Sequence, residues 1–187
     1  MKSIIPLAHS ILEESLREGD IVVDATLGNG HDSLFLSKIV RKEGAVYGFD
    51  IQEEAILQSK KLFQQEDAQN IYTFNIGHEN AADLLKQKEV ESIDGVIFNL
   101  GYLPGGDHTV TTLSRTTIIA FNDLFELLKP NKYIVFVVYP GHEQGNHESD
   151  SLVSHLSKIP AKDADIAKYQ MVNRSEAAPY VIAVFKK

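Results

Sequence analysis

The spacing of the hydrophobic positions changes repeatedly along the chain, and each change predicts a new helix or strand. Apolar residues recur at helical intervals over residues 4–16 and then form a short β-branched run over 21–25. The same alternation predicts helices at 32–43, 52–65, 78–86, 114–128 and 149–159, and strands at 45–50, 70–75, 94–99, 132–139, 166–171 and 179–185.

Strands that alternate with helices indicate a parallel sheet with right-handed crossovers and helices on both faces. The last two predicted strands are joined by residues 172–178 without a helix, so they must be antiparallel, because a short loop cannot make a parallel crossover. The run 132–139 is the most hydrophobic and should be a central strand, preceded by a turn at 129–131 and followed by a loop at 140–148. We therefore predict an α/β, Rossmann-like fold with a seven-stranded, mostly parallel sheet and a C-terminal antiparallel hairpin.

The composition is that of one globular domain spanning residues 1–187, with 43% hydrophobic and 24% charged residues. The absence of cysteine excludes disulfides, thiolate metal sites and a cysteine nucleophile. No apolar run reaches membrane-spanning length and the start has no signal-peptide core, so we expect a cytoplasmic protein without a membrane partner.

The charge of the chain is uneven. A net charge of −8 argues against a protein that coats nucleic acid non-specifically. Residues 151–187, however, carry six Lys or Arg against three acids, a net +3, which leaves −11 for residues 1–150. A polyanionic partner would meet the C-terminal part, and an ordinary solvated face explains the same charges equally well.

Polar residues stand at the ends of five predicted strands, namely Asp24, Asp50, Asn75, Asn99 and Tyr139. In such a sheet, ligands bind at the carboxyl ends of the strands where the strand order reverses. Although Asp and Asn also favour turns, five such endings predict a site at this edge.

The segment after the first strand, Gly28-Asn29-Gly30, is a glycine turn that lets a ligand approach the backbone. Asp50 follows Gly30 by 20 positions, the spacing at which a carboxylate reaches the ribose hydroxyls of a nucleoside over the turn. These two features indicate a nucleoside-containing cofactor.

Asp32 and Ser33, which follow the turn, favour one kind of nucleoside cofactor over another. A dinucleotide site usually has a third glycine where this chain has Ser33, and the neighbouring Asp32 would repel a pyrophosphate. The same carboxylate complements the ammonium group of S-adenosylmethionine (SAM), which has no phosphate. A helix N-cap is an alternative role for Asp32.

The fourth strand ends in Asn99-Leu100-Gly101-Tyr102, which resembles the Asn-Pro-Pro-Tyr signature of methyltransferases acting on nitrogen. In such sites the Asn oxygen accepts from the target amine and the Tyr packs on the base. An aliphatic amine must first lose a proton, for which the candidates are Asp107, His108, Tyr139 and His142. Each of these is equally well explained as a loop residue that bonds its own backbone.

Other catalytic motifs are weaker or missing. The histidines of His142-Glu143 and His147-Glu148 are five positions apart rather than the four that a helical zinc motif requires, so we predict no metal. The chain has no Walker loop and no nucleophile elbow.

With these motifs, the chain resembles the class I SAM-dependent methyltransferases and, among them, the small bacterial YtqB-like family of rRNA methylases. The stretches that carry the resemblance are 24–32, 48–52, 77–80 and 99–107. The resemblance implies SAM as cofactor and methylation of the aminomethyl group of 5-aminomethyl-2-thiouridine at the wobble position, in the anticodon region of tRNA.

The resemblance also implies roles for particular residues. Catalysis would fall to Asn99, Tyr102, Asp107 and His108. Cofactor binding would fall to Asp24, Thr26, Gly28, Asn29, Gly30, His31, Asp32, Asp50, Gln52, His78, Glu79 and Asn99. The RNA would meet Arg115, Tyr139, His142, Tyr169, Asn173 and Arg174. Alternatives are a methyltransferase acting on rRNA or a small-molecule amine, and a non-catalytic nucleotide-binding or RNA-binding module; a homodimer is left open.

Overall fold

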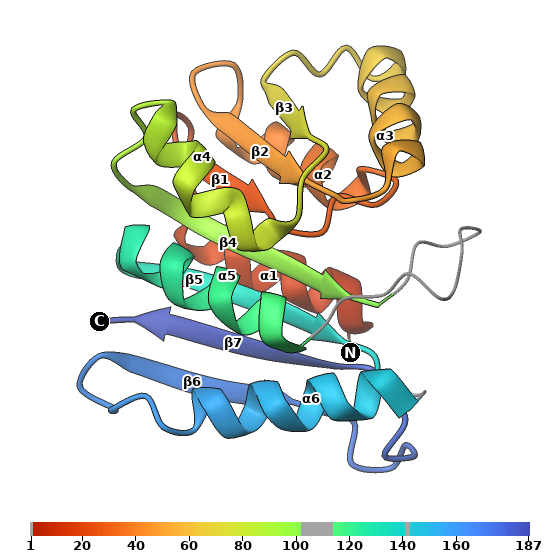
Figure 1. Cartoon of the computed structure of the whole chain (residues 1–187), viewed down its shortest axis with the longest axis vertical. Helices are drawn as coiled ribbons and strands as arrows, with labels where there is room; N and C mark the ends of the chain where they lie inside the picture. The colour runs from red at the N-terminus through yellow and green to blue at the C-terminus, as the bar shows by residue number, and fades with distance from the viewer. Residues whose placement is uncertain (1, 102–113, 141–142) are drawn as a thin grey trace.

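Seven strands form one sheet in the order β3-β2-β1-β4-β5-β7-β6 (Figure 1), in a computed structural model that describes residues 2–101, 114–140 and 143–187. The strands are β1 (Ile21–Asp24), β2 (Ala45–Phe49), β3 (Ile71–Phe74), β4 (Ile93–Leu100), β5 (Leu128–Val138), β6 (Ala164–Tyr169) and β7 (Tyr180–Lys186). The helices are α1 (Ile4–Ser15), α2 (His31–Val40), α3 (Glu53–Gln65), the short 3₁₀ helix η1 (His78–Asn80), α4 (Ala81–Gln87), α5 (Ser114–Leu127) and α6 (Glu143–Leu156).

The pairing of the strands confirms the predicted topology. Strands β1 to β5 are parallel to one another, and β7 lies antiparallel between β5 and β6. The chain runs outward through β1, β2 and β3 and then returns to place β4 on the other side of β1. The reversal of strand order, where a ligand is expected, therefore lies between β1 and β4.

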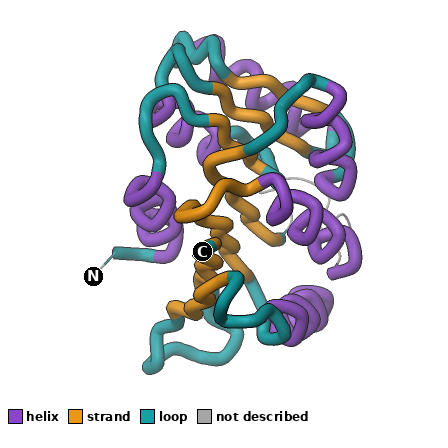
Figure 2. Tube along the Cα trace, turned by 90° about the vertical axis from the view of Figure 1, so that its left-hand side faces the viewer, coloured by secondary structure: helices purple, strands orange, loops and turns teal. Residues whose placement is uncertain are grey.

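Helices cover both faces of the sheet (Figure 2). Along β4, Val96 and Phe98 face the core shared with α4, α5 and α6, whereas Ile97 faces the core shared with α1 and α2. Where both faces of a strand are buried its residues are apolar, which explains the hydrophobic runs 96–98 of β4 and 134–138 of β5.

Strand β5 begins earlier than the sequence pattern predicts. The pairing jumps from Ile93 opposite Leu128 to Gly95 opposite Tyr133, so the expected turn at 129–131 is a bulge within the strand. The amines of Lys129 and Lys132 lie 2.9 and 3.4 Å from Oδ1 of the buried Asp94. These long-range ion pairs stabilise the bulge, and a local sequence pattern contains no sign of them.

The predicted loop at 140–148 is wrong in its second half, because α6 already begins at Glu143. Residues 143–148 contain no apolar side chain, so hydrophobic periodicity could not reveal the first turns of this helix. In the described part of the chain, no helix combines the length and the apolar character needed to cross a membrane.

Candidate functional site

The polar strand ends meet at the carboxyl edge of the sheet, around the reversal of strand order. Asp24 ends β1 and lies opposite Ile97 of β4. Asp50 follows β2, and Nδ2 of Asn75, after β3, donates to the backbone oxygen of Asp50 at 3.0 Å. The parallel strands thus bring together side chains that are far apart in the sequence.

The glycine turn is fastened to the end of β2 by Asp50. Its Oδ2 accepts from the backbone N–H of Gly28 at 2.9 Å, and its Oδ1 accepts from that of Gln52 at 2.9 Å. Because each carboxylate oxygen has two acceptor positions, one on each oxygen remains for another donor. This arrangement suits two neighbouring hydroxyls of a ribose.

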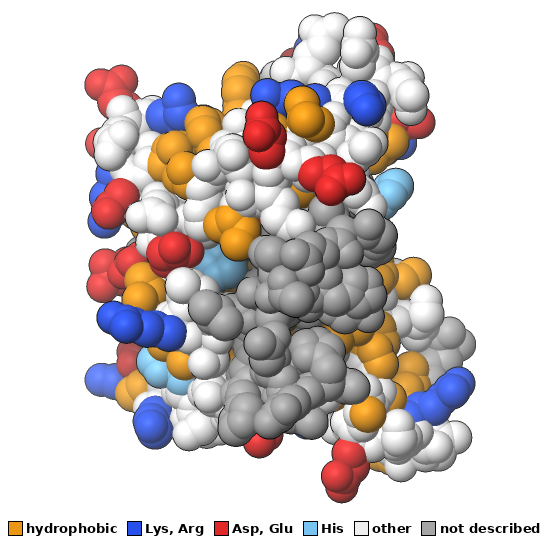
Figure 3. All heavy atoms as spheres, turned by 45° about the vertical axis from the view of Figure 1, so that its right-hand side comes forward, with side chains coloured by type: hydrophobic (Ala, Val, Ile, Leu, Met, Phe, Trp, Pro, Cys, Tyr) orange, Lys and Arg blue, Asp and Glu red, His pale blue; other side chains and the backbone are white. Residues whose placement is uncertain are grey.

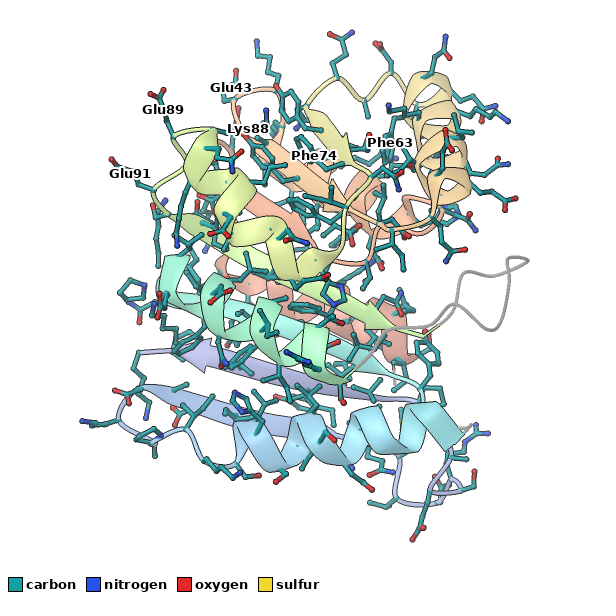
Figure 4. All side chains as sticks on the ribbon, viewed as in Figure 1. Glu43, Phe63, Phe74, Lys88, Glu89 and Glu91 are labelled. Atoms are coloured by element: carbon teal, nitrogen blue, oxygen red, sulfur yellow. The ribbon has the colours of Figure 1, made fainter. Side chains whose placement is uncertain are left out.

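The turn passes close to α3, which makes glycine necessary at position 30. Gly30 has φ +86°, and a Cβ atom on it would lie 2.7 Å from the ring of Phe63. Phe63 is buried and α3 directs it toward the sheet (Figure 4). A side chain at position 30 would therefore displace the turn from its place above Asp50.

Asp24 is fully buried at the end of β1. Its Oδ2 accepts from Oγ of Ser33 at 2.6 Å and its Oδ1 from the backbone N–H of Thr26 at 3.2 Å. Burial and the neighbouring carboxylate of Asp32 raise the pKa of Asp24 to about 7, against 3.8 for an ordinary Asp. The neighbouring carboxylates that help to raise this pKa repel one another. A cationic ligand would relieve that repulsion, whereas a phosphate would increase it.

Asp32 is not a helix N-cap. Gly30 holds that position, and Asp32 lies inside the first turn of α2. Its Oδ1 is 2.6 Å from Nε2 of His9, and its Oδ2 accepts from Nδ2 of Asn99 at 3.0 Å. This carboxylate therefore connects α1, α2 and β4.

His9 is the site residue that the sequence reasoning missed. Its ring stacks on Phe35, with centroids 3.8 Å apart and an interplanar angle of 7°. It follows Ile5 by four positions and precedes Leu12 by three, so it stands on the apolar stripe of the first helix. A polar residue on a stripe that packs on the sheet was the available signal.

Asn99 is held from two sides. Its backbone N–H donates to Oγ1 of Thr26 at 2.6 Å, and its side-chain amide donates to Asp32. An ionised carboxylate can only accept, so the amide nitrogen must face Asp32. The amide oxygen, Oδ1, makes no hydrogen bond with a described residue and is the acceptor that remains.

His78 supplies another acceptor, which is buried. Its Nδ1 lies 3.1 Å from the backbone oxygen of Ala25, which requires the proton on Nδ1. Burial lowers the pKa of His78, so the ring is neutral, and its buried Nε2 has no hydrogen-bond partner among the described residues. Such an orphaned acceptor is suited to an N–H of a ligand.

Tyr139 follows β5 and lies beside the same cluster. A Cβ atom on Gly101 would be 3.7 Å from its ring. Burial and the charge of Asp32 raise the pKa of Tyr139 above its usual value of 10. Its phenol is thus protonated near neutral pH, so Tyr139 is a poor candidate for the base that deprotonates an amine.

The predicted RNA-contacting residues of the C-terminal hairpin lie further away. Strand β6 is parallel to β5 and is separated from β4 by two strands, roughly 14 Å at the usual strand spacing. Its end, Tyr169, and the following Asn173 and Arg174 are exposed at the same edge of the sheet as the site. Arg115 is exposed at the start of α5.

Four predicted residues, Tyr102, Asp107, His108 and His142, lie outside the described residues. On the face shown in Figure 3, the described Lys and Arg side chains are spread around the margin rather than gathered in one patch. Within the described ranges, no group of three or more His, Asp or Glu could hold a metal ion.

The residues present fit SAM. The free acceptor positions of Asp50 suit its ribose, the carboxylates around the turn suit its ammonium and sulfonium, and residues 24–33 contain no Lys or Arg to pair with a pyrophosphate. A structure of similar fold supports this fit: a "putative methyltransferase" from Streptococcus mutans in complex with SAH, with TM-score 0.88 and 29% identity, covers 100% of this chain and 99% of its own. The fold and the site thus define a class I SAM-dependent methyltransferase.

Within this class, a family model described as "Putative rRNA methylase" matches residues 46–185. The chain belongs to this family. A "putative rRNA-methylase" from Clostridium thermocellum has a structure with TM-score 0.94 and 32% identity, covering 100% of this chain and 99% of that one.

Two further relatives differ in how much they share with the chain. A protein of Arabidopsis thaliana named "tRNA (mnm(5)s(2)U34)-methyltransferase, chloroplastic" is 35% identical over 195 residues, which cover 100% of this chain and 70% of that protein. The "Ribosomal RNA small subunit methyltransferase H" of Dictyoglomus thermophilum is 35% identical over 88 residues, covering 47% of this chain and only 29% of its own length.

Proposed function

We propose that this methyltransferase transfers the methyl group of SAM to the aminomethyl nitrogen of 5-aminomethyl-2-thiouridine at the wobble position of tRNA. The observation that carries the proposal is the 35% identity to the Arabidopsis tRNA methyltransferase along the whole of this chain. The remaining acceptor of Asn99 supports it, because a primary amine has N–H groups to donate to an amide oxygen.

The proposed chemistry depends mainly on alignment. When bound, SAM supplies a methyl group on a positively charged sulfur. Oδ1 of Asn99 holds the acceptor nitrogen so that its lone pair points along the line of that carbon–sulfur bond. The acceptor ammonium would first give one proton to water, which frees this lone pair. As the nitrogen–carbon bond forms, the electron pair of the breaking carbon–sulfur bond would stay on sulfur, and the products would be the methylated ammonium and neutral SAH. Orientation of this kind supplies much of the catalysis in such a transfer.

The cofactor-binding residues are those around the glycine turn and its neighbours. We assign the ribose to Asp50 and Gln52, the methionine part to the turn and Asp32, and the adenine to His78 and Glu79. The assignment rests on the free acceptor positions of Asp50 and on the orphaned Nε2 of His78. The full proposed set is Asp24, Thr26, Gly28, Asn29, Gly30, His31, Asp32, Asp50, Gln52, His78, Glu79 and Asn99.

The RNA would lie across the carboxyl edge of the sheet. Arg174 and Asn173 in the loop after β6 are exposed at this edge and could hold a phosphate and a sugar of the substrate. Tyr169 is 45% exposed and offers a ring for stacking. Arg115, Tyr139 and the four residues outside the described ranges complete the proposed acceptor site.

The test is mass spectrometry of tRNA nucleosides from cells that lack the protein. We expect the unmethylated aminomethyl nucleoside to accumulate, the wild-type gene to restore the methylated one, and Asn99→Ala to fail to restore it. Restoration by Asn99→Ala would instead support a non-catalytic binding module. An unchanged wobble nucleoside would refute the proposed substrate.

Nucleosides from the rRNA of the same cells test methylation of rRNA. This alternative is favoured by the partial match to the ribosomal RNA methyltransferase, which covers 47% of the chain. Loss of one methylated rRNA nucleoside with an intact wobble nucleoside would establish it. We favour tRNA because the tRNA enzyme matches this chain from end to end.

A further inference from the structure

A hydrogen-bonded row of three side chains runs from α1 to the end of β4. We propose that His9 is a positioning residue: through Asp32, it holds the amide of Asn99 with its oxygen toward the acceptor amine. This inference rests on the proposed function, because it assumes that Asn99 holds the acceptor. His9 does not itself contact the substrate in this proposal.

The orientation of the Asn99 amide follows from Asp32. The distance of 3.0 Å between Nδ2 of Asn99 and Oδ2 of Asp32 is that of an ordinary hydrogen bond. If the amide were flipped, its oxygen would face a carboxylate oxygen, and its nitrogen would face the N–H groups of the amine. Both contacts would then be repulsive, so Asp32 selects the orientation that accepts from an amine.

Asp32 needs a second anchor to perform this role. A carboxylate held by one hydrogen bond can rotate about its side-chain torsions, which would move Asn99 with it. Nε2 of His9 lies 2.6 Å from the other oxygen, Oδ1, and occupies it. The side chains of His9 and Asp32 are only 17% and 9% exposed, so water competes weakly for this bond.

The ring of His9 is itself held in place. It lies 3.8 Å from the ring of Phe35 and nearly parallel to it, which fixes the direction of Nε2. Helix α1 packs on β5 and β7 through Ala8 and Leu12, on either side of His9. The packing of this helix therefore determines where Asp32, and with it Asn99, is held.

Two substitutions separate positioning from packing. His9→Phe keeps an aromatic ring against Phe35 but removes the donor to Asp32. His9→Gln removes the ring but can place an amide N–H where Nε2 lies. We expect His9→Phe to lower kcat about 10-fold or more, as small misalignments of reacting groups do. The Kd for SAM should rise by a smaller factor, because Asp32 loses one anchor while Asp50 and the glycine turn still hold the cofactor. We expect His9→Gln to recover most of the loss.

His155→Phe is the matched control. The ring of His155 also bonds a side chain, Oδ1 of Asn122 at 2.8 Å, and lies edge-on to Phe121, but on α6 and away from the site. We expect wild-type turnover from it. In an Asn99→Ala background, His9→Phe should have no further effect on turnover, because the group through which His9 acts is gone.

A measurement without substrate distinguishes failure of this inference from failure of the proposed function. In ¹⁵N NMR spectra, the Asn99 side-chain amide, assigned by its loss in Asn99→Ala, should be protected from solvent exchange in the wild type and in His9→Gln. It should lose that protection in His9→Phe.

Equal protection in all three proteins, or equal kcat for His9→Phe and wild type, would overturn the inference. If the wild type binds SAM but does not methylate aminomethyl tRNA, the proposed substrate is wrong, and the NMR result still decides the role of His9.

Discussion

The carboxylate of Asp50 accepts a hydrogen bond from the backbone amide of Gly28 at 2.9 Å, although 22 positions separate the two residues. The bond ties the glycine turn after β1 to the end of β2. Because the backbone amide of Gln52 donates to the other oxygen, Oδ1, one acceptor position remains on each carboxylate oxygen for further donors. The same group therefore shapes the turn and is available to bind the ribose of SAM.

Asp50→Ala should weaken SAM binding about 100-fold. It removes the two hydrogen bonds that the ribose hydroxyls would donate to the carboxylate, and it releases the glycine turn. Titration calorimetry with SAM measures the change. Asp83→Ala, at an exposed position on α4, is the control and should bind like the wild type. An unchanged Kd for Asp50→Ala would rule out the ribose role.

Gly30 and Gly19 form a natural pair for a steric test. Their φ angles are +86° and +87°, so alanine costs a similar backbone strain at each, about 1 kcal/mol. A Cβ atom at Gly19 meets nothing within 4 Å, whereas one at Gly30 lies 2.7 Å from Phe63. Gly30→Ala should therefore lose more stability and SAM affinity than Gly19→Ala. Equal effects in thermal melts and calorimetry would show that the turn tolerates a side chain.

Asn99→Ala should lower kcat about 100-fold, with the Kd for SAM raised less than about 5-fold, because it removes the group that aligns the acceptor. Single-turnover assays on tRNA that contains the aminomethyl nucleoside would measure it. Asn80→Ala, which loses only an exposed 3.3 Å bond to the backbone oxygen of Gly77, should leave kcat unchanged. A loss confined to SAM affinity would contradict the catalytic role of Asn99.

Asp24 should make stability fall as the pH rises. Its pKa of about 7 in the folded state exceeds the ordinary 3.8, so between these pH values the folded protein binds a proton that the unfolded chain has lost. This stabilisation is complete below about pH 4 and disappears as the pH rises through 7. In the cofactor-free protein, Asp24→Asn should therefore gain melting temperature relative to wild type from pH 5 to pH 8, by about 5 °C. A constant difference would show that Asp24 does not take up this proton.

Asp94 should have the opposite pH dependence. Burial alone would raise the pKa of Asp94, but hydrogen bonds from Lys129 and the backbone of Ile21 outweigh burial and lower it below 3.8. Its stabilisation is therefore present above pH 4 and is lost as the pH falls through the lowered pKa. Asp94→Asn should cost about 2 kcal/mol at pH 7 and much less below pH 3.

The control for Asp94 is an exposed ion pair. Glu66 lies 3.1 Å from the amine of Lys38, and both side chains are largely solvated. Glu66→Gln should change the free energy of unfolding by less than about 0.5 kcal/mol at pH 7. Urea unfolding of both variants measures the difference, and similar losses in the two would mean that the burial of Asp94 adds nothing.

Local pattern was sufficient for most of the fold. The alternation of strand and helix, and the missing helix between the last two strands, predicted a seven-stranded sheet with an antiparallel hairpin, and the structure confirms both. The predictions for two segments were wrong, each for a physical reason. Residues 143–148 are helical without any apolar side chain, and residues 129–131 join β5 because Asp94 attracts Lys129 and Lys132 from another strand.

By itself, the sequence determined the elements, the glycine turn and the polar strand ends, since each depends on neighbours within a few positions. Only the tertiary structure decided that His9, Asp32 and Asn99 form one row, across separations of 23 and 67 positions. A hydrogen bond requires its atoms to be within about 3.5 Å. No spacing along the chain gives that distance until the order of the strands and the packing of α1 have fixed it.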